Sequence, residues 1–225
     1  MLRFKNVSKS FGRKIEVLRN LNFEIVDKEF VFLVGPSGAG KTTILRLILR
    51  DFLPTEGEIF VDDFELKKIR PGQIPLLRRT LGMIFQDFKV LFERTIFENV
   101  AVALEILGKG KKEIKKEAEE ALESVGILDK ENYFPIQLSA GEIQRLSIAR
   151  AIVGNPKIIL ADEPTGNLDP ATSWGILKIL NNINKTGKTV LMATHNIDIV
   201  NSMKKRVITL DKGKIVRDEK EGKYV

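Results

Sequence analysis

The sequence lacks cysteine altogether, and its 225 residues include a single histidine. Because there is no thiol, the chain can form neither a disulfide nor a thiolate nucleophile, which suits a reducing compartment. No apolar run approaches the roughly 20 residues that cross a bilayer, and residues 1–11 lack the apolar core of a signal peptide. We therefore expect a cytosolic protein without a transmembrane segment of its own.

Positive charge is only moderately in excess, because 37 lysines and arginines against 30 aspartates and glutamates give a net charge of +7. Part of this charge gathers in residues 67–79, which hold five cations and no acid. Such a stretch can be a solvated face, a contact with anionic lipid headgroups or a contact with nucleic acid. No nucleic-acid motif and no interleaved aromatic residue accompanies it, so dedicated nucleic-acid binding is a weaker interpretation than lipid contact.

Patterns of buried strands and of helices alternate along much of the chain. Residues 30–35, 158–160 and 189–194 are continuous apolar runs, typical of strands inside a parallel sheet. Helical patterns lie at residues 42–50 and 173–184. This repetition of strand, loop and helix indicates an open α/β sheet.

Two regions depart from that alternation. Apolar and polar side chains alternate in the first thirty residues, which predicts strands of a partly exposed antiparallel sheet. Residues 54–63 look like a turn that leads into another strand. Residues 88–155 are expected to be mainly helical, with one apolar stripe packed on a neighbouring helix and formed by Ile114, Ala118, Leu122 and Val125. After Asp211 we expect a short hairpin and a solvated end.

A glycine-rich stretch joins the first buried strand to the first helix. It matches the phosphate-loop pattern G-x-x-x-x-G-K-[ST] and comprises Gly35, Pro36, Ser37, Gly38, Ala39, Gly40, Lys41, Thr42 and Thr43. The glycines let backbone N–H groups curl around phosphates, Lys41 brings a positive charge to the β- and γ-phosphates, and Thr42 can ligate Mg²⁺. Between a strand and a helix, the motif predicts a nucleotide site.

Polar residues follow two of the later strands, where ligands bind in such sheets. Asp162 suits the coordination sphere of Mg²⁺, and Glu163 suits the attacking water, as general base or as the group that positions it. His195 follows the strand at 189–194 and is expected beside the γ-phosphate. Gln86 also follows apolar residues, and we expect it to reach the metal or the water.

A second glycine-bearing helix start, "LSAGE", begins at Leu138. Ser139 and Glu142 form the S-x-x-E pattern of a capping box. A capped helix start is also an anion site, because Gly141 would let the backbone approach a phosphate and Ser139 could donate to it. One chain already has a phosphate loop for its nucleotide, so this second site makes sense if it serves the nucleotide of another copy.

Taken in order, "GPSGAGKTT", Gln86, "LSAGE", "ILADEP", "NLD" at 167–169 and His195 resemble the motif set of the ATP-binding cassette (ABC) ATPases. The likeness spans essentially the whole chain. It implies a P-loop NTPase core over about 1–87 and 156–225, with an N-terminal antiparallel β subdomain and a helical subdomain inserted at 88–155.

The resemblance also implies an Mg²⁺-dependent ATPase that forms a head-to-tail homodimer, with two ATP molecules between phosphate loops and opposing signature helices. The catalytic residues would be Glu163, His195, Lys41 and Gln86, and the metal residues Thr42, Gln86 and Asp162. The nucleotide would contact the phosphate loop together with Phe11, Gln86, Ser139, Ala140, Gly141, Glu142 and His195. Phe11 stands where the family more often has a tyrosine that stacks on adenine, and "LSAGE" departs from the usual L-S-G-G-Q.

Within the family, "GMIFQDFKVL" and "MATHN" resemble the cell-division ATPases. These act with an FtsX-like integral membrane protein to regulate cell-wall hydrolysis, which implies a peripheral position at the cytoplasmic face of the membrane. The partner would be gripped near Gln86 by Phe88, Val90, Leu91 and Phe92, which could equally be core residues. The macrolide-export and lipoprotein-release ATPases share "ADEPTGNLD" and remain an alternative.

Two more distant alternatives fit less well. A DNA-associated ABC ATPase would carry a long coiled-coil insertion between phosphate loop and signature, and this sequence has none. A nucleotide-binding regulatory module without turnover would not need Glu163 and His195.

Overall fold

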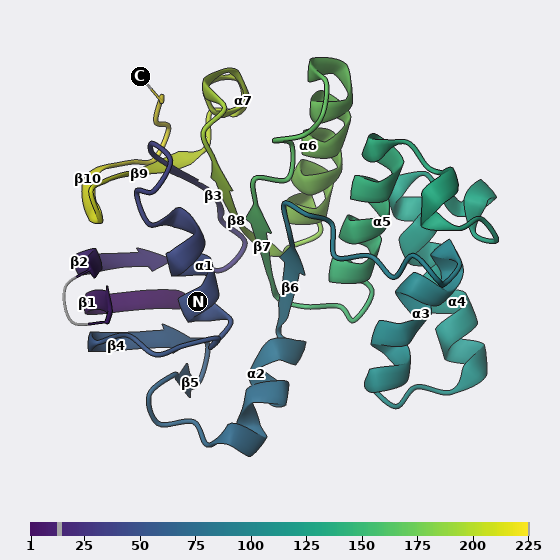
Figure 1. The fold of residues 1–225 in the computed structure, drawn as a ribbon, viewed down its shortest axis with the longest axis horizontal. Helices are drawn as coiled ribbons and strands as arrows, with labels where there is room; N and C mark the ends of the chain where they lie inside the picture. Colours follow the sequence, from purple (N-terminus) through teal and green to yellow (C-terminus); the bar gives the residue numbers. More distant parts are fainter. Residues whose placement is uncertain (13–14, 225) are drawn as a thin grey trace.

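The computed structural model describes residues 1–12 and 15–224. Within these ranges the chain forms a central sheet with a smaller antiparallel sheet on one side and a group of helices on the other (Figure 1). The α/β class predicted from the sequence is confirmed. No described helix is long and apolar enough to cross a membrane.

The central sheet has six described strands in the order β10-β9-β3-β8-β7-β6. Neighbouring strands from β9 to β6 are parallel, and β10 pairs antiparallel with β9 as the predicted hairpin. The strands are β3 (Phe30–Val34), β6 (Leu81–Ile84), β7 (Ile158–Asp162), β8 (Thr189–Thr194), β9 (Arg206–Asp211) and β10 (Lys214–Glu219).

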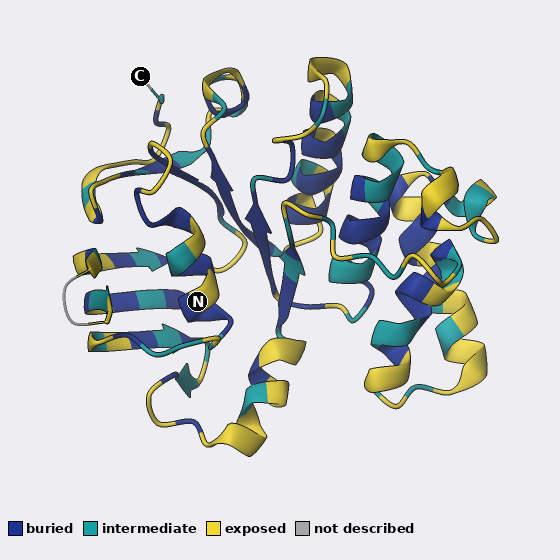
Figure 2. Cartoon of the chain, in the orientation of Figure 1, coloured by how far each residue is buried: buried dark blue, intermediate teal, exposed yellow. Residues whose placement is uncertain are grey.

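Every residue of β3, β7 and β8 is buried, because both faces of the sheet are covered (Figure 2). Alternate side chains of β3 point to opposite faces, as a period of two requires. Phe32 belongs to the core that packs on α5 (Ala140–Ile152) and α6 (Pro170–Lys185), whereas Leu33 belongs to the core around α1 (Lys41–Ile48).

The second sheet is the predicted antiparallel one, with strands in the order β2-β1-β4-β5. Its strands are β1 (Leu2–Phe11), β2 (Ile15–Ile25), β4 (Glu56–Val61) and β5 (Phe64–Glu65). Their buried residues share one core with α1, so this sheet covers the face of the central sheet on which the phosphate-loop helix lies.

The predicted helical region contains α3 (Ile96–Ile106), α4 (Lys111–Val125), α5, and the short helices η2 (Leu128–Lys130) and η3 (Pro135–Gln137). Of the predicted stripe on α4, Ala118, Leu122 and Val125 are buried and Ile114 is partly buried. They face α3 and α5, as expected.

Some local structure was not predicted. The basic stretch folds as η1 (Pro71–Gln73) and α2 (Ile74–Arg79), and α7 (Ile197–Met203) follows the histidine. In the basic stretch, Arg78 donates to the Leu49 carbonyl and to Asp51. α6 starts at Pro170, a few residues before the predicted helix, since Asp169 caps it by accepting from the Thr172 amide.

Candidate nucleotide site

A cavity of about 710 Å³ opens at the carboxyl ends of β3, β7 and β8. Its size lies in the usual range for small-molecule sites, about 300–1,000 Å³. Its lining consists of Val17, Pro36, Ser37, Gly38, Gly40, Lys41, Thr42, Thr43, Gln86, Glu163, His195 and Tyr224. The structure therefore brings the phosphate loop, Gln86, Glu163 and His195 to one place, although they are far apart in the sequence.

The start of α1 is open to a ligand. Its N-cap, Gly40, has φ of 109° and makes no side-chain cap, and the first turn contains no acid. The first amides of a helix have no acceptor inside the helix, so here they can serve an anion. The loop also needs its glycines for space, because a Cβ on Gly35 would lie 2.2 Å from the Leu210 carbonyl oxygen.

The Lys41 ammonium lies inside the loop rather than in solvent. It donates to the carbonyl oxygens of Gly35 at 2.8 Å and Pro36 at 3.2 Å. It also lies 3.8 Å from Oε1 of Glu163. The cation is thus held by its own loop and lies close to the carboxylate predicted to act on water.

Thr42 and Asp162 form a pair of hard oxygen donors. The Thr42 hydroxyl donates to Oδ1 of Asp162 at 3.1 Å. Burial raises the pKa of the Asp162 carboxyl, and the charge of the adjacent Glu163 acts in the same direction. A buried carboxylate of this kind favours a nearby cation.

Two oxygen donors fit Mg²⁺ in particular, because this ion usually keeps several waters and binds few protein groups alongside substrate phosphates. Among the described residues no group of three or more His, Cys, Asp or Glu side chains forms a closed metal cage. The pair is therefore suited to a metal that arrives with a phosphorylated ligand.

Glu163 and His195 are directly paired. Nδ1 of His195 lies 2.9 Å from Oε1 of Glu163, and the His195 amide donates to Oε2 at 3.3 Å. Glu163 adopts a left-handed backbone conformation, with φ of 47°, and its amide donates to the carbonyl of Ala193 on β8. Strand pairing between β7 and β8 thus sets the position of both residues.

The signature residues lie elsewhere. None of residues 138–142 lines the cavity. Ser139 accepts from the Glu142 amide, and Oε2 of Glu142 accepts from both the amide and the hydroxyl of Ser139, which confirms the predicted capping box. Lys130 pairs with Glu142, and together with the cap it lowers the pKa of this carboxyl to about 2.

Gly141 has a packing role that the sequence does not reveal. A Cβ at this position would lie 2.4 Å from Cγ2 of Thr172, at the start of α6. The glycine therefore allows two helix starts to approach each other, in addition to leaving its backbone accessible.

Phe11 does not line the cavity but stands at the exposed end of β1 with a second aromatic ring. Its ring lies edge-on to Phe52, with centroids 5.1 Å apart, and the Lys9 ammonium lies 4.9 Å from both. The sequence did not predict the cavity residues Val17 and Tyr224, because no motif contains them.

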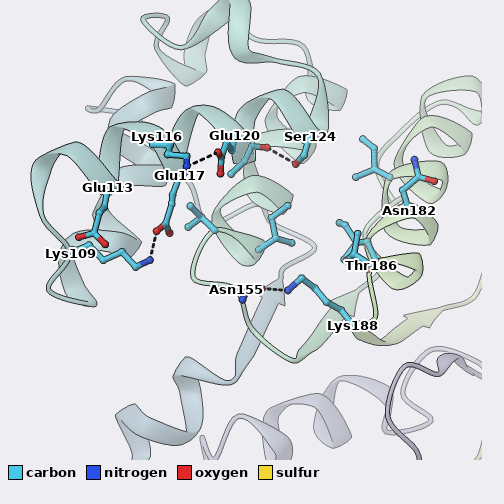
Figure 3. A pocket seen from close by; sticks show the side chains of 15 residues that line it. Lys109, Glu113, Lys116, Glu117, Glu120, Ser124, Asn155, Asn182, Thr186 and Lys188 are labelled. Atoms are coloured by element: carbon cyan, nitrogen blue, oxygen red, sulfur yellow. Dashed lines mark hydrogen bonds and ion pairs between the residues drawn. The ribbon is translucent and has the colours of Figure 1, made fainter.

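A second cavity, of about 680 Å³, lies between α4, α5 and α6 (Figure 3). It is near the amino ends of β7 and β8, opposite the phosphate loop. Several of its polar groups already have partners: Lys109 pairs with Glu117, and Lys188 donates to Asn155 and to the Pro156 carbonyl. Unlike the first cavity, it does not border the start of α1, whose N-cap makes no side-chain cap.

Comparison with known proteins agrees with this geometry. The model of the ABC transporter family matches residues 18–166. This stretch includes the phosphate loop, "LSAGE" and Glu163. The chain belongs to the ABC transporter family and is an ATPase with the ATP-binding cassette fold.

Its curated relatives include cell division ATP-binding proteins called FtsE. The chain is 50% identical to that of Bacillus subtilis over 224 residues, covering 100% of this chain and 98% of the relative. It is 48% identical to that of Mycobacterium tuberculosis over 225 residues, covering 100% and 98%.

Solved structures of cassettes are also similar. A dimeric ATP-binding cassette in a post-hydrolysis state, bound to ADP and phosphate, superposes with a TM-score of 0.88 at 37% identity over 100% of both chains. CbiO1 of Clostridium perfringens, part of an ABC transporter complex, gives a TM-score of 0.91 at 28% identity, covering 98% of this chain and 88% of that one.

Proposed function

We propose that this chain is the ATP-hydrolysing subunit of an FtsEX-like complex, which drives an FtsX-like membrane partner to regulate cell-wall hydrolysis at division. The observation that carries the proposal is the phosphate-loop cavity in a chain that is 45–50% identical, over 95–100% of its length, to FtsE proteins of several bacteria. Its place would be the cytoplasmic face of the membrane, where it is held by the partner.

The phosphate-loop amides and Lys41 would bind the phosphates. Mg²⁺, when bound, would neutralise charge on the phosphate oxygens, and Thr42, Asp162 and Gln86 would hold it. Glu163 would orient and deprotonate the attacking water, and His195 would contact the γ-phosphate.

The two contacts of the Glu163 carboxylate suggest how this group becomes available to water. Lys41 and His195 both lie against this carboxylate. A γ-phosphate carries more charge than a carboxylate and would compete for both partners. Glu163 would then be released toward water only when a triphosphate occupies the cavity.

The second half of the site would come from another copy. Ser139, Ala140, Gly141 and Glu142 lie outside the cavity of their own chain. The similar cassette bound to ADP and phosphate is dimeric. A head-to-tail homodimer would bring each signature helix to the opposite nucleotide, and closure and reopening would follow binding and hydrolysis.

For the subdomains we propose a nucleotide-binding core over about 1–87 and 156–225 and a helical lobe over 88–155. Some of the first residues of that lobe are fixed by internal contacts. Val90 packs against the buried hydrophobic cluster, and the buried Asn99 side chain forms hydrogen bonds with both the amide and the carbonyl of Leu91. Phe92 is 53% exposed.

The partner's cytoplasmic helix would dock at Phe92 and in a groove whose Arg150 donates to the Lys89 carbonyl, three residues before Phe92. This groove, of about 500 Å³, lies between α2, α3 and the end of α5 and is lined by Ile74, Pro75, Arg78, Arg79, Leu81, Ala103, Ile106, Leu107, Arg150, Ala151, Gly154 and Pro156. The apolar floor and three arginines suit an amphipathic helix with acidic residues.

Partner capture tests this function. Glu163→Gln protein with ATP would be immobilised, native membranes solubilised in detergent would be passed over it, and retained proteins would be identified by mass spectrometry. We expect an FtsX-like protein with an extracytoplasmic domain. Recovery of an export permease instead would establish the alternative, a macrolide-export or lipoprotein-release ATPase.

A matched pair of variants tests the groove. Ile106 is 72% exposed in the groove, and Val216 is 60% exposed on β10. Ile106→Glu should abolish capture and leave the ATPase activity of the isolated protein unchanged, whereas Val216→Glu should change neither. If both variants captured the partner equally well, the groove would be excluded as its docking site.

A further inference from the structure

The segment that follows β10 returns to the nucleotide cavity. The Gly222 amide donates to the Lys205 carbonyl at 3.2 Å, next to the start of β9. A Cβ on Gly222 would lie 2.7 Å from Cβ of Val207. Only glycine allows the chain to lie this close to β9, so the return path is built into the local sequence.

Two hydrogen bonds then attach Tyr224 to α7. The Tyr224 amide donates to Oδ1 of Asn201 at 2.8 Å, and Nδ2 of Asn201 donates to the Tyr224 carbonyl at 3.1 Å. α7 begins two residues after His195, and its N-cap is Asn196. The pair of bonds therefore fixes Tyr224 relative to the helix that follows the predicted γ-phosphate residue.

The side chain of Tyr224 is partly buried. It packs against the core cluster and lines the cavity together with Ser37 and His195. Within the described ranges, its hydroxyl has no hydrogen-bond partner, although its backbone has two. A tyrosine that lines a phosphate-binding cavity in this way offers an unused donor to a ligand.

We propose that Tyr224 is a nucleotide-contacting residue whose phenolic hydroxyl donates a hydrogen bond to the terminal phosphate of bound ATP. Asn201 is then a positioning residue that acts through it. The inference rests on the proposed function of the cavity, with the γ-phosphate beside His195. It adds a source of discrimination, because ADP has no phosphate at that end and leaves the hydroxyl without this partner.

The test is nucleotide affinity measured by isothermal titration with a non-hydrolysable ATP analogue and with ADP, both with Mg²⁺. Tyr224→Phe retains the ring and removes the hydroxyl. It should weaken binding of the analogue about tenfold, as expected for one hydrogen bond to a charged group, and leave ADP binding unchanged. Tyr133→Phe is the control, since Tyr133 is the other tyrosine of the chain and does not line the cavity.

Asn201→Ala tests the positioning role. It should reproduce the selective loss at a smaller size, about threefold, with an unchanged affinity for ADP. A general loss of structure would instead weaken both nucleotides together. If Tyr224→Phe is selective but Asn201→Ala is not, Tyr224 remains a contact residue and the role of Asn201 is wrong.

Lys41→Ala separates failure of this inference from failure of the proposed site. If Lys41→Ala weakens both nucleotides while Tyr224→Phe changes neither, the cavity binds nucleotide and only the inference is wrong. If Lys41→Ala also changes neither, the nucleotide binds elsewhere, and both proposals are wrong.

Discussion

Two helix starts in this molecule use opposite solutions to the same problem. The first amides of any helix lack acceptors within the helix. At α1 the N-cap is Gly40, which has no side chain to cap them. At α5 the cap is Ser139, which forms a reciprocal box with Glu142 that Lys130 reinforces.

The difference shows which helix start depends on a ligand. The α1 start leaves its amides to the cavity, and its stability depends on the loop and on what the cavity binds. At the α5 start, Ser139 caps the Glu142 amide and Glu142 caps the Ser139 amide, so this helix start holds its shape without a ligand. An anion that approached α5 would meet the Ala140 and Gly141 amides and would compete with Glu142 for the Ser139 hydroxyl.

The largest effect is expected on ATP hydrolysis, from a change of Glu163 in the cavity at the start of α1. Glu163→Gln should lower phosphate release at least about 100-fold, because an amide cannot accept the proton of water. ATP binding should be retained. Turnover would be followed by a phosphate-release assay and affinity by titration.

Glu120→Gln, on the exposed face of α4, is the control for that measurement and should behave as wild type. A Glu163→Gln protein that hydrolyses ATP at the normal rate would falsify the catalytic role.

Mixing two inactive variants tests whether α5 serves another copy. Ser139→Ala and Lys41→Ala should each lose most turnover alone. In a head-to-tail mixed dimer one site carries both defects and the other carries none. An equimolar mixture should therefore recover up to about a quarter of wild-type phosphate release, by random pairing.

The control for this mixing experiment is Ser139→Ala mixed with Ser139→Ala,Lys41→Ala double-variant protein, in which no site is intact. Recovery in that control, or none in the first mixture, would mean that α5 does not complete the opposite site.

A smaller effect, on the melting temperature, is expected from a change of Asp162. Burial raises the pKa of this carboxyl, so the folded protein binds its proton more tightly than the unfolded chain does. Its ionisation therefore destabilises the nucleotide-free protein above the raised pKa, and the penalty disappears as pH falls. Asp162→Asn should raise the melting temperature at neutral pH by about 2–4 °C without Mg²⁺, while Mg²⁺-dependent turnover is lost.

Differential scanning calorimetry between pH 4 and 8 would measure this, with exposed Asp129→Asn as the control. An unchanged or lower melting temperature for Asp162→Asn would show that the Thr42 hydrogen bond outweighs burial.

The smallest effect is expected at the α5 cap. The pKa of Glu142 is lowered from 4.5 to about 2, first by Lys130 and then by Ser139. Its stabilising contribution is therefore complete above pH 4.5 and is lost as pH falls through about 2. Glu142→Gln should lower the free energy of unfolding by less than about 1 kcal/mol and flatten this acid limb.

Glu98→Gln supplies the matched comparison, because Glu98 closes the same type of box with Thr95 at the start of α3. Urea denaturation at pH 7 and at low pH would compare the two variants. Equal effects would mean that Lys130 contributes nothing at α5.

Much of the fold follows from local pattern. The apolar runs predicted β3, β7 and β8, and the S-x-x-E pattern predicted the cap of α5. Strand burial and helix capping depend mostly on residues within a few positions of each other, so they can be recognised in a sequence. η1, α2 and α7 were missed because they are short and have weak apolar periodicity.

Residues of the candidate site were predicted only where they belong to a recognisable sequence motif. The phosphate loop, Asp162, Glu163 and His195 were identified, and the structure brings them together. The cavity residues Val17 and Tyr224 were not predicted, since each reaches the cavity only through the fold of distant parts of the chain. Gly141 was assigned a role toward phosphate, and its close approach to Thr172 depends on how α5 and α6 pack.

The sequence by itself therefore determined the family, the phosphate loop between β3 and α1, and the cap of α5, because these depend on residue type and short spacing. Only the tertiary structure decided which groups meet. The parallel pairing of β7 with β8 joins Glu163 to His195, and Asn201 brings Tyr224 to the same cavity. Such contacts depend on strand order and helix packing, which act across the whole chain.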